Sequence, residues 1–331
     1  MLFQTKTSDQ IIDSYNEGKG SEQMNPKEIL VLGGSYFTGR IFTIMATRAG
    51  LAVTLLNRGR YSMERYGTKR ELHFDRHDAL SLEHMEPVFY DAVIDFCGYE
   101  PGDVKTFVEC FPGQLGQYIF LSTADVYERP GPVVKDENVP LMETEYGCPG
   151  GAYMLKKAQL EKEVCQVCSA RGIPYTILRP ALIYGPYNYA PRESYYIQKI
   201  FQGEPIPVPA DADGEFQFVY VKDVCTAILQ SLGRKAAYNE AFNLCAPEVI
   251  TYPIYMETLR QVSGRPFETY PVRVETVLAQ NIPLPFPLRA AESERFSGQK
   301  AAQRLGIEYT SFAVGMEFAY RGFAALYEDK S

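Results

Sequence analysis

Short apolar runs alternate along the chain with stretches whose apolar side chains recur at helical spacing. From Glu28, EILVL is an apolar run, GGSYFTG is a glycine-rich turn, and the residues after it have helical periodicity up to a second apolar run, AVTLLN. This order predicts a strand–helix–strand unit of about 30 residues. Because such a crossover joins parallel strands, it also predicts a parallel sheet.

The same alternation continues as far as Pro180. We predict further strands in four apolar segments, LHFDRHD, YDAVIDFCG, QYIFLSTADVY and YTILRP. Helices are predicted between them, over Asp103–Cys110 and Tyr153–Arg171. The expected fold is therefore α/β, a Rossmann-type doubly wound parallel sheet over residues 28–180 that is completed by segments within 215–250.

The composition changes after Pro180, where tyrosine and proline are frequent in segments such as YGPYNYAPRESYY and GEPIPVPADADGE. We expect residues 181–214 and 251–331 to form a smaller C-terminal α/β region that binds the substrate. Residues 1–27 are polar and turn-rich. They are predicted to be an extension with one short helix over Ser8–Glu17.

Composition and charge narrow the class of protein. The 331 residues are 46% apolar and 22% charged, values that exclude a disordered or collagen-like chain. The net charge of −8 argues against a nucleic-acid partner, since no long basic run offsets it. No segment has the roughly 20 apolar residues of a membrane span, and the N-terminus has no apolar signal-peptide core. The 7 cysteines do not form a disulfide framework, so we expect a cytoplasmic protein without membrane association.

The glycine-rich turn is the first candidate site. Gly33 permits a tight turn, the backbone amides of the turn can approach a pyrophosphate, and the following helix directs its positive N-terminus toward the phosphates. We predict that a dinucleotide binds here, at Gly33, Ser35, Tyr36, Phe37 and Gly39. A plain glycine turn is the alternative.

The second strand ends at Asn57 and Arg58, where NAD-binding folds usually place a carboxylate against the ribose 2′-hydroxyl. No carboxylate is present there in the sequence. Arg58 can instead bind the 2′-phosphate of NADP bidentately, which favours NADP(H) over NAD(H). The alternative is that Arg58 is a solvated loop charge while Asn57 bonds to a 2′-hydroxyl.

Tyr153 and Lys157 are four residues apart in a predicted helix and therefore lie on one face of it. An ammonium at Lys157 would lower the pKa of Tyr153 from about 10 toward working pH, so that Tyr153 can act as general acid/base. The hydroxyl of Thr123, at the end of the preceding strand, could hold the same substrate oxygen. By itself this spacing is more typical of a surface pair, but its place after the glycine turn and the Ser-Thr strand end favours catalysis.

In this order and spacing, the motifs resemble those of the extended short-chain dehydrogenase/reductase family, the NAD(P)-dependent nucleotide-sugar epimerases and dehydratases. The resemblance covers nearly all of the chain after residue 28, and its motifs include VLGGSYFTG, HFDRHD, VIDFCGY, YIFLSTADVY, YMLKK, YTILRPALIYGP and FVYVKDVCTAI. It implies that Thr123, Tyr153 and Lys157 form a catalytic triad. It also implies that Asp75 contacts the adenine and that Phe96, Cys97 and Gly98 line the cofactor. We further predict cofactor contacts at Arg76 and Pro180, and a substrate site at Tyr99, Asp125 and Arg192.

The middle glycine of the family's turn falls on Tyr36 in this chain. The turn thereby resembles an atypical branch that includes chloroplast stem-loop-binding, RNA-associated proteins, which have a bulky middle residue and similar Arg-Gly sequences after the second strand. A non-catalytic nucleotide-sensing or RNA-associated protein is therefore one alternative function.

Other motifs have simpler interpretations. Cys165 and Cys168 lie inside a predicted helix without a second pair, and His73 and His77 lie in a predicted strand and loop, so we predict no metal site. Arg192 either reaches a substrate phosphate or belongs to a loop of packed tyrosines.

The sequence therefore predicts an NAD(P)-dependent enzyme of the epimerase/dehydratase type, in which Tyr153 acts on a nucleotide sugar while hydride moves to or from the nicotinamide. An NADP-dependent carbonyl reductase is the alternative enzyme. By resemblance, the helices over Asp103–Cys110 and Tyr153–Arg171 would pair with their copies in a homodimer, the second offering apolar Val164 and Val167.

Overall fold

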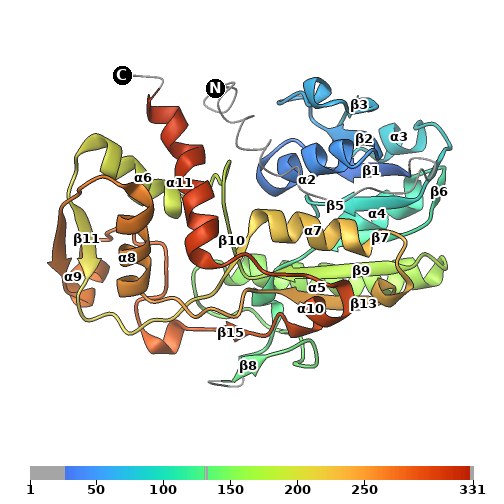
Figure 1. Cartoon of the computed structure of the whole chain (residues 1–331). Helices are drawn as coiled ribbons and strands as arrows, with labels where there is room; N and C mark the ends of the chain where they lie inside the picture. Colours follow the sequence, from blue (N-terminus) through green and yellow to red (C-terminus); the bar gives the residue numbers. More distant parts are fainter. Residues whose placement is uncertain (1–26, 130, 132, 329–331) are drawn as a thin grey trace.

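The computed structural model describes residues 27–129, 131 and 133–328. At its centre is a seven-stranded parallel sheet with the strand order β13-β9-β7-β5-β1-β2-β3 (Figure 1). In chain order the strands are β1 (Glu28–Leu32), β2 (Ala52–Asn57), β3 (Arg70–His73), β5 (Ala92–Asp95), β7 (Tyr118–Leu121), β9 (Tyr175–Pro180) and β13 (Glu240–Leu244). The doubly wound α/β fold predicted from the sequence is confirmed.

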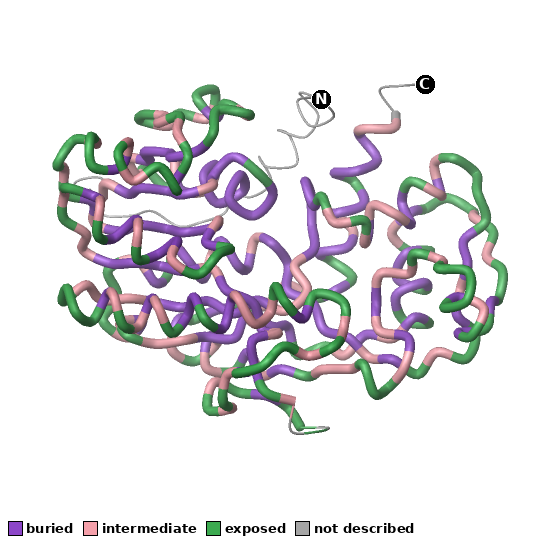
Figure 2. Tube along the Cα trace, turned by 180° about the vertical axis from the view of Figure 1, so that it is seen from behind, coloured by how far each residue is buried: buried purple, intermediate pink, exposed green. Residues whose placement is uncertain are grey.

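Two layers of helices enclose the sheet, whose strands are mostly buried between them (Figures 1 and 2). On one face α2 (Phe37–Arg48) packs beside α7 (Val221–Ser231), and on the other α4 (Asp103–Cys110) packs beside α5 (Gly151–Ala170). Side chains of β1 alternate between the two layers: Ile29 and Val31 join the core under α2 and α7, while Leu30 and Leu32 join the core under α4 and α5. Because both faces are buried, the strand is a continuous apolar run rather than an alternating one.

The two predicted helices α4 and α5 are found where the sequence placed them, although α5 begins two residues earlier, at Gly151 rather than Tyr153. Val164 of α5 is fully buried against the sheet. It therefore belongs to the chain's own core and offers no surface to a second copy, contrary to the expectation from the sequence. The predicted N-terminal helix Ser8–Glu17 lies outside the described residues.

The chain leaves neighbouring strands β1 and β5 in opposite directions, since α2 follows β1 onto one face of the sheet and α4 follows β5 onto the other. At such a switch in winding direction the carboxyl ends of the two strands border a crevice in which ligands of doubly wound proteins bind. In this chain the expected position of the ligand is beside the Gly33–Gly39 turn and residues 96–98, and we call this position the crevice. We call the ends of β1, β2, β5 and β7, with the turns that follow them, the carboxyl edge.

The rest of the chain adds small elements, many of them in a second body beside the sheet (Figure 1). Four parallel strand pairs are β10 (Leu182–Tyr184) with β12 (Phe218–Tyr220), β11 (Ile206–Pro209) with β14 (Thr269–Val272), β15 (Arg295–Phe296) with β8 (Val134–Lys135), and β4 (Phe89–Tyr90) with β6 (Gln114–Leu115). The further α-helices are α3 (Ala79–Glu83), α6 (Glu193–Gln202), α8 (Tyr252–Ser263), α9 (Val274–Ala279), α10 (Gln299–Leu305) and α11 (Phe312–Glu328). The short 3₁₀ helices are η1 (Glu64–Tyr66), η2 (Ala124–Val126), η3 (Lys235–Ala237) and η4 (Ala290–Glu292). Within the described residues, no helix has both the length and the apolar character needed to cross a membrane.

Aromatic side chains form the core of the second body. The rings of Phe216 and Phe286 stack with centroids 4.5 Å apart, and Phe218 stacks on Phe312 at 5.0 Å. α11 packs against α6 and α8. These rings belong to the same core cluster as the side chains packed under α2 and α7, so the core of the second body is continuous with the core on one face of the sheet.

Asp223 joins α7 to the segment that leads into α11. Its carboxylate accepts hydrogen bonds from the backbone N–H and from the hydroxyl of Thr310, each 2.8 Å long. Only 5% of Asp223 is exposed, and this burial raises the pKa of its carboxyl from 3.8 to about 6, although the Thr310 bonds act in the opposite direction. Keeping the Asp223 carboxylate ionised in the folded chain therefore costs free energy.

This pKa shift predicts a pH dependence of stability. Because the folded state binds the Asp223 proton more tightly than the unfolded state, stability falls as pH rises from about 4 to 6. When the pH is lowered from 7.5 to 5, the unfolding free energy of the wild type should rise by about 1 kcal/mol more than that of Asp223→Asn. The variant has no carboxylate at this position that could bind the proton. Urea unfolding of both proteins at the two pH values measures this difference, and equal gains would show that Asp223 has an ordinary pKa.

Candidate functional site

The glycine turn packs tightly against the end of β5. Gly33 has a φ of +81°, and a Cβ at this residue would lie 2.9 Å from Cβ of Cys97. A Cβ on Gly39 would lie 2.6 Å from the carbonyl oxygen of Gly33. Both contacts are shorter than side chains tolerate, so the sequence has glycine where the turn meets β5 and where α2 meets the turn.

Two buried polar groups at the carboxyl edge have no hydrogen-bond partner among the described residues. The Oδ1 atom of Asn57 accepts the N–H of Gly59 at 2.6 Å, but its Nδ2 is unpartnered, as is the hydroxyl of Ser122 at the end of β7. Unpaired buried groups cost free energy, and a ligand with hydroxyl or phosphate oxygens would satisfy them. The residues present therefore fit a dinucleotide, with Asn57 suited to hold a ribose oxygen.

Arg58 follows Asn57 and is exposed, and its charge contributes to the electrostatic field at Asp75. The backbone N–H of His77 donates to Asp75 at 3.0 Å and its ring lies 2.6 Å away, and these contacts lower the pKa of the Asp75 carboxyl. Arg58 and Asp75 thus lie on the same side of the crevice, beside β2 and β3. This placement is compatible with the predicted contacts to the 2′ position and the adenine, which stay predictions.

The guanidinium of Arg76 is turned into the protein rather than toward the crevice. Its Nη1 lies 2.7 Å from Oδ1 of Asp95, and its Nη2 donates to the carbonyl of Asp103 at 2.9 Å. Burial alone would raise the pKa of Asp95, but the Arg76 guanidinium holds it below its ordinary value. The other Asp95 oxygen accepts the hydroxyl of Tyr118 at 2.6 Å, and Oδ1 also accepts the N–H of Cys97 at 2.9 Å. The Arg76 side chain therefore stabilises the segment after β5, and its predicted contact with the cofactor has no support from the side-chain geometry.

Lys157 is almost completely buried beneath the crevice. Its ammonium donates to the carbonyls of Gly98 at 2.9 Å and Leu121 at 2.8 Å, and it lies 4.6 Å from the ring centroid of Phe120. Burial lowers the pKa of Lys157 to about 8. The ammonium therefore links the ends of β5 and β7, which border the crevice.

Tyr153 lies one turn before Lys157 with 42% of its surface exposed. Loss of hydration, followed by the negative charge of Asp125, raises the pKa of the Tyr153 phenol above its ordinary value. The sequence-based expectation that Lys157 lowers this pKa is thus wrong for this state of the protein, because the ammonium is engaged by two carbonyls instead. At neutral pH the phenol carries its proton.

Thr123 and Asp125 complete this part of the site. The Thr123 hydroxyl lies 3.3 Å from Oδ2 of Asp125 and also accepts the N–H of Asp125, so it caps η2. Burial raises the pKa of the Asp125 carboxyl. The Thr123 bond and the charges of Arg129 and Arg192 offset part of this increase. Arg192 donates to the carbonyl of Ile183 at 3.2 Å and is partly exposed.

Most of the predicted site residues lie at the carboxyl edge, whereas Asp75 follows β3, Pro180 ends β9 and Arg192 precedes α6. Tyr99 is 47% exposed beside Lys157, whose ammonium lies 5.1 Å from its ring centroid. The remaining predicted cofactor residues lie at strand ends, namely Phe96, Cys97 and Gly98 after β5 and Pro180 at the end of β9.

Aromatic rings that the sequence analysis did not assign to a site lie over the glycine turn. The ring of Tyr36 stacks on Tyr61 with centroids 5.7 Å apart and on Tyr189 at 5.2 Å. Tyr189 also meets Phe37 edge-on at 6.0 Å and contributes to the raised pKa of Tyr153. Tyr189, from the loop between β10 and α6, therefore lies between the glycine turn and Tyr153. Its only sequence signal was the density of tyrosine in YGPYNY, which packing alone could explain.

The glycine turn, the crevice and the order of the strands agree with a match to a known family. The model of the NAD dependent epimerase/dehydratase family matches residues 29–245, more than half of the chain. The chain belongs to this family. The family assignment made from the motifs is thereby confirmed.

One curated relative of this chain is the chloroplast stem-loop binding protein of 41 kDa b of Arabidopsis thaliana. It is 30% identical over 259 residues, which are 72% of this chain and 64% of the relative. The chain thus spans less than two thirds of the length of that relative.

Solved structures of epimerases share the fold of this chain at low identity. The UDP-glucose 4-epimerase of Thermotoga maritima with UDP-glucose has a TM-score of 0.71 and 20% identity, covering 90% of this chain and 99% of that one. The UDP-glucuronic acid 4-epimerase of Bacillus cereus, in complex with UDP-glucuronic acid and NAD, has a TM-score of 0.70, 17% identity and coverages of 90% and 99%. The Mth375 epimerase of Methanothermobacter thermautotrophicus has a TM-score of 0.74, 17% identity and covers 98% of both chains.

Across residues 27–129, 131 and 133–328, no three His, Cys, Asp or Glu side chains are grouped so that they could hold a metal ion. Cys165 and Cys168 are free thiols on α5, and burial raises the pKa of Cys168 to about 12.

Proposed function

We propose that the chain is an NAD(P)-dependent enzyme of the epimerase/dehydratase type that acts on a nucleotide sugar. The proposal rests on the position of Lys157, whose ammonium donates to the carbonyls of Gly98 and Leu121 at the ends of β5 and β7. Tyr153 lies one turn before it on α5, and Thr123 follows β7. The ligands named for the epimerases of similar fold, UDP-glucose and UDP-glucuronic acid, support this substrate class.

The proposed roles follow from the protonation of each group. Because the Tyr153 phenol is neutral at pH 7, it donates the proton of its Oη to a substrate carbonyl oxygen, and it takes that proton back in the reverse direction. Thr123 orients the same oxygen through its hydroxyl. The Asp125 carboxylate and the Arg192 guanidinium bind hydroxyl and phosphate groups of the substrate, and Tyr99 packs beside them.

A nicotinamide dinucleotide supplies the hydride donor or acceptor when bound, and in its oxidised form adds a positive charge to the crevice. The chain's own part is to hold it at residues 33–39, Asn57 and residues 96–98, and to keep Lys157 fixed on the carbonyls of Gly98 and Leu121. We further propose that Arg58 selects NADP(H) over NAD(H). A cytoplasmic location and a homodimer through α4 and α5 stay predictions.

Tyr153→Phe tests the catalytic role. Removing the hydroxyl should lower kcat by about 100-fold or more, the usual loss for a positioned acid/base, and leave cofactor affinity nearly intact. Tyr270→Phe is the matched control, because Tyr270 is 43% exposed but lies on β14, far from the crevice in the chain's second body. Wild-type turnover of the nucleotide sugar by Tyr153→Phe would refute the role.

Arg58→Ala tests the cofactor preference. Loss of a hydrogen-bonded cation at the 2′-phosphate should weaken NADPH binding by about 1.5–3 kcal/mol and barely change NADH binding. Calorimetric titration of both cofactors measures this, with the exposed Arg273→Ala as control. Equal losses for NADPH and NADH would contradict a 2′-phosphate contact.

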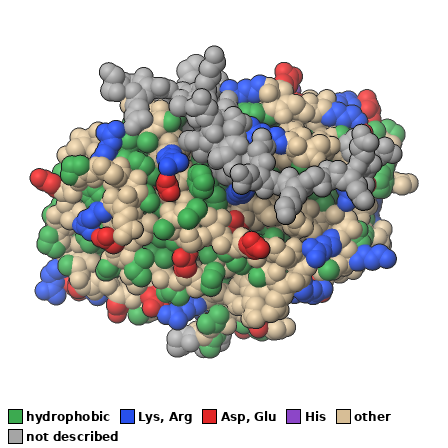
Figure 3. All heavy atoms as spheres, viewed as in Figure 1, with side chains coloured by type: hydrophobic (Ala, Val, Ile, Leu, Met, Phe, Trp, Pro, Cys, Tyr) green, Lys and Arg blue, Asp and Glu red, His purple; other side chains and the backbone are tan. Residues whose placement is uncertain are grey.

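An RNA-associated function is the second candidate, favoured by the name of the Arabidopsis relative. The net charge of −8 disfavours it, and on the face in Figure 3 basic and acidic side chains are interspersed rather than gathered into a stripe. A binding protein of this kind would not depend on the Tyr153 hydroxyl. The Tyr153→Phe experiment therefore separates the two functions.

A further inference from the structure

The guanidinium of Arg40 is buried without an anionic partner. Arg40 lies near the start of α2 and is 4% exposed. Its Nη2 donates to the hydroxyl of Tyr66 at 2.9 Å, while its Nε has no hydrogen-bond partner. In the part of the chain that the structure describes, no carboxylate pairs with it. A buried cation in this state costs free energy unless an anion joins it.

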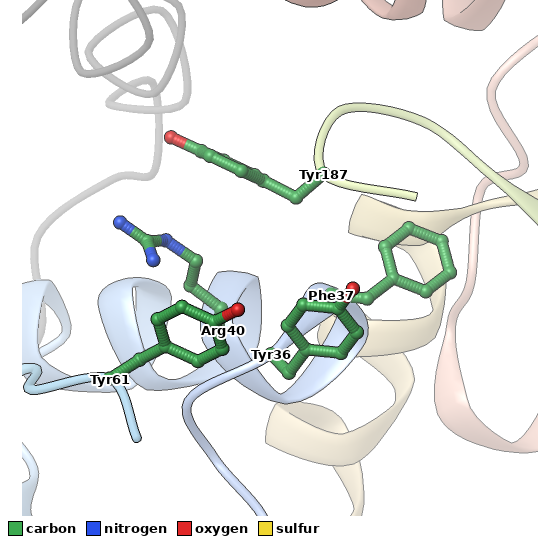
Figure 4. A pocket seen from close by; sticks show the side chains of 5 residues that line it. All are labelled: Tyr36, Phe37, Arg40, Tyr61 and Tyr187. Atoms are coloured by element: carbon green, nitrogen blue, oxygen red, sulfur yellow. The ribbon is translucent and has the colours of Figure 1, made fainter. Parts of the chain in front are cut away.

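Aromatic rings surround the Arg40 guanidinium. The centre of the guanidinium lies 5.4 Å from the ring centroid of Tyr66 and 4.8 Å from that of Tyr187. Such contacts offset only part of the lost hydration of a cation. Figure 4 shows the Arg40 side chain rising from α2 between the rings of Tyr187 and Tyr61. With Tyr36 and Phe37, these residues line a small pocket.

The pocket lies at the N-terminus of α2, a helix of 12 residues whose N-cap, Tyr36, makes no side-chain capping bond. The first N–H groups of a helix have no partners within it, and together with the helix dipole they favour an anion. Because side chains of a helix lean toward its N-terminus, Arg40 and Tyr36, one turn apart, reach the same space. Two independent features, free helix amides and an unpaired buried guanidinium, thus point to one anion.

Dinucleotide-binding folds of this kind hold the pyrophosphate at the first amides of this helix. We propose that Arg40 is a further phosphate-binding residue of this chain, whose guanidinium binds the same pyrophosphate from the pocket. A planar guanidinium fork matches phosphate oxygens in geometry and charge. Tyr36 holds a side chain where a glycine would let the pyrophosphate touch the backbone, and the long Arg40 side chain bridges the added distance. That the ligand is a dinucleotide rests on the proposed function; inorganic phosphate or pyrophosphate has the same chemistry and could fill the site independently.

The test is Arg40→Met, which keeps an apolar stem of similar length and removes the charge. Calorimetric titrations with NADH, NADPH and inorganic pyrophosphate should each show affinity lower by about tenfold or more, and the loss should be the same for the two dinucleotides because both contain a pyrophosphate. Thermal unfolding without ligand should show an unchanged or higher Tm, because an unpaired buried charge has been removed. Arg260→Met, on α8, is the control and should change none of these affinities.

Three outcomes would overturn the proposal. Unchanged affinities with a lower Tm would make Arg40 a packing residue, and a loss confined to NADPH would assign it to the 2′-phosphate. If Arg40→Met does not fold, Arg40→Lys retains the charge without the planar fork, and wild-type affinity in that variant would exclude recognition by the guanidinium. A different result concerns the proposed function. If the protein binds pyrophosphate through Arg40 but binds no dinucleotide, the phosphate site is upheld and the proposed function is refuted.

Discussion

The crevice depends on how closely the glycine turn approaches the end of β5. A Cβ on Gly33 would lie 2.9 Å from Cβ of Cys97, so the turn and the strand end can meet only through glycine. The strand end is fixed in turn by Asp95, which accepts the N–H of Cys97 and pairs with Arg76 at 2.7 Å. One residue further, the carbonyl of Gly98 accepts the ammonium of Lys157. A chain of contacts thus runs from the turn through Asp95 and Gly98 to Lys157 of α5, and it fixes the end of β5 against the turn.

Three buried cations surround this edge, and each is stabilised differently. Arg76 pairs with a carboxylate, Lys157 donates to two backbone carbonyls, and Arg40 lies between aromatic rings. An ion pair neutralises a buried charge most fully, carbonyl dipoles do so in part, and rings least. Arg76 therefore stabilises the fold. The charges of Lys157 and Arg40 are less fully compensated, and an anion near either would add stabilisation.

The fold was predictable because burial on both faces imposes a simple pattern on parallel strands. The runs EILVL and AVTLLN, with a glycine turn between them, predicted β1, α2 and β2, and helical periodicity placed α4 at its observed bounds. The contacts of the site residues were less predictable, because they depend on the direction in which long side chains point in the folded protein. Arg76 follows a strand in sequence, yet its guanidinium folds back onto Asp95. Tyr153 and Lys157 share a helix face, yet the ammonium prefers two carbonyls to the phenol.

The contacts of the tyrosines in the loop after β10 could not be predicted from the sequence either. No spacing rule links Tyr36 to Tyr189, which are distant in sequence and meet only because the second body brings its loop over the glycine turn. Long-range aromatic contacts of this kind are set by tertiary packing rather than by local propensity. The sequence motifs therefore locate the glycine turn, but they do not predict which rings lie over it.

The crystal structure of the chain with NADPH tests most directly whether this crevice is a dinucleotide site. We predict a pyrophosphate at the N-terminus of α2, a ribose oxygen on the unpartnered Nδ2 of Asn57, and the nicotinamide on the side of Tyr153, with the ring of Tyr189 moved off Tyr36. NADPH bound elsewhere, or no NADPH in the crystal at saturating concentration, would contradict the account.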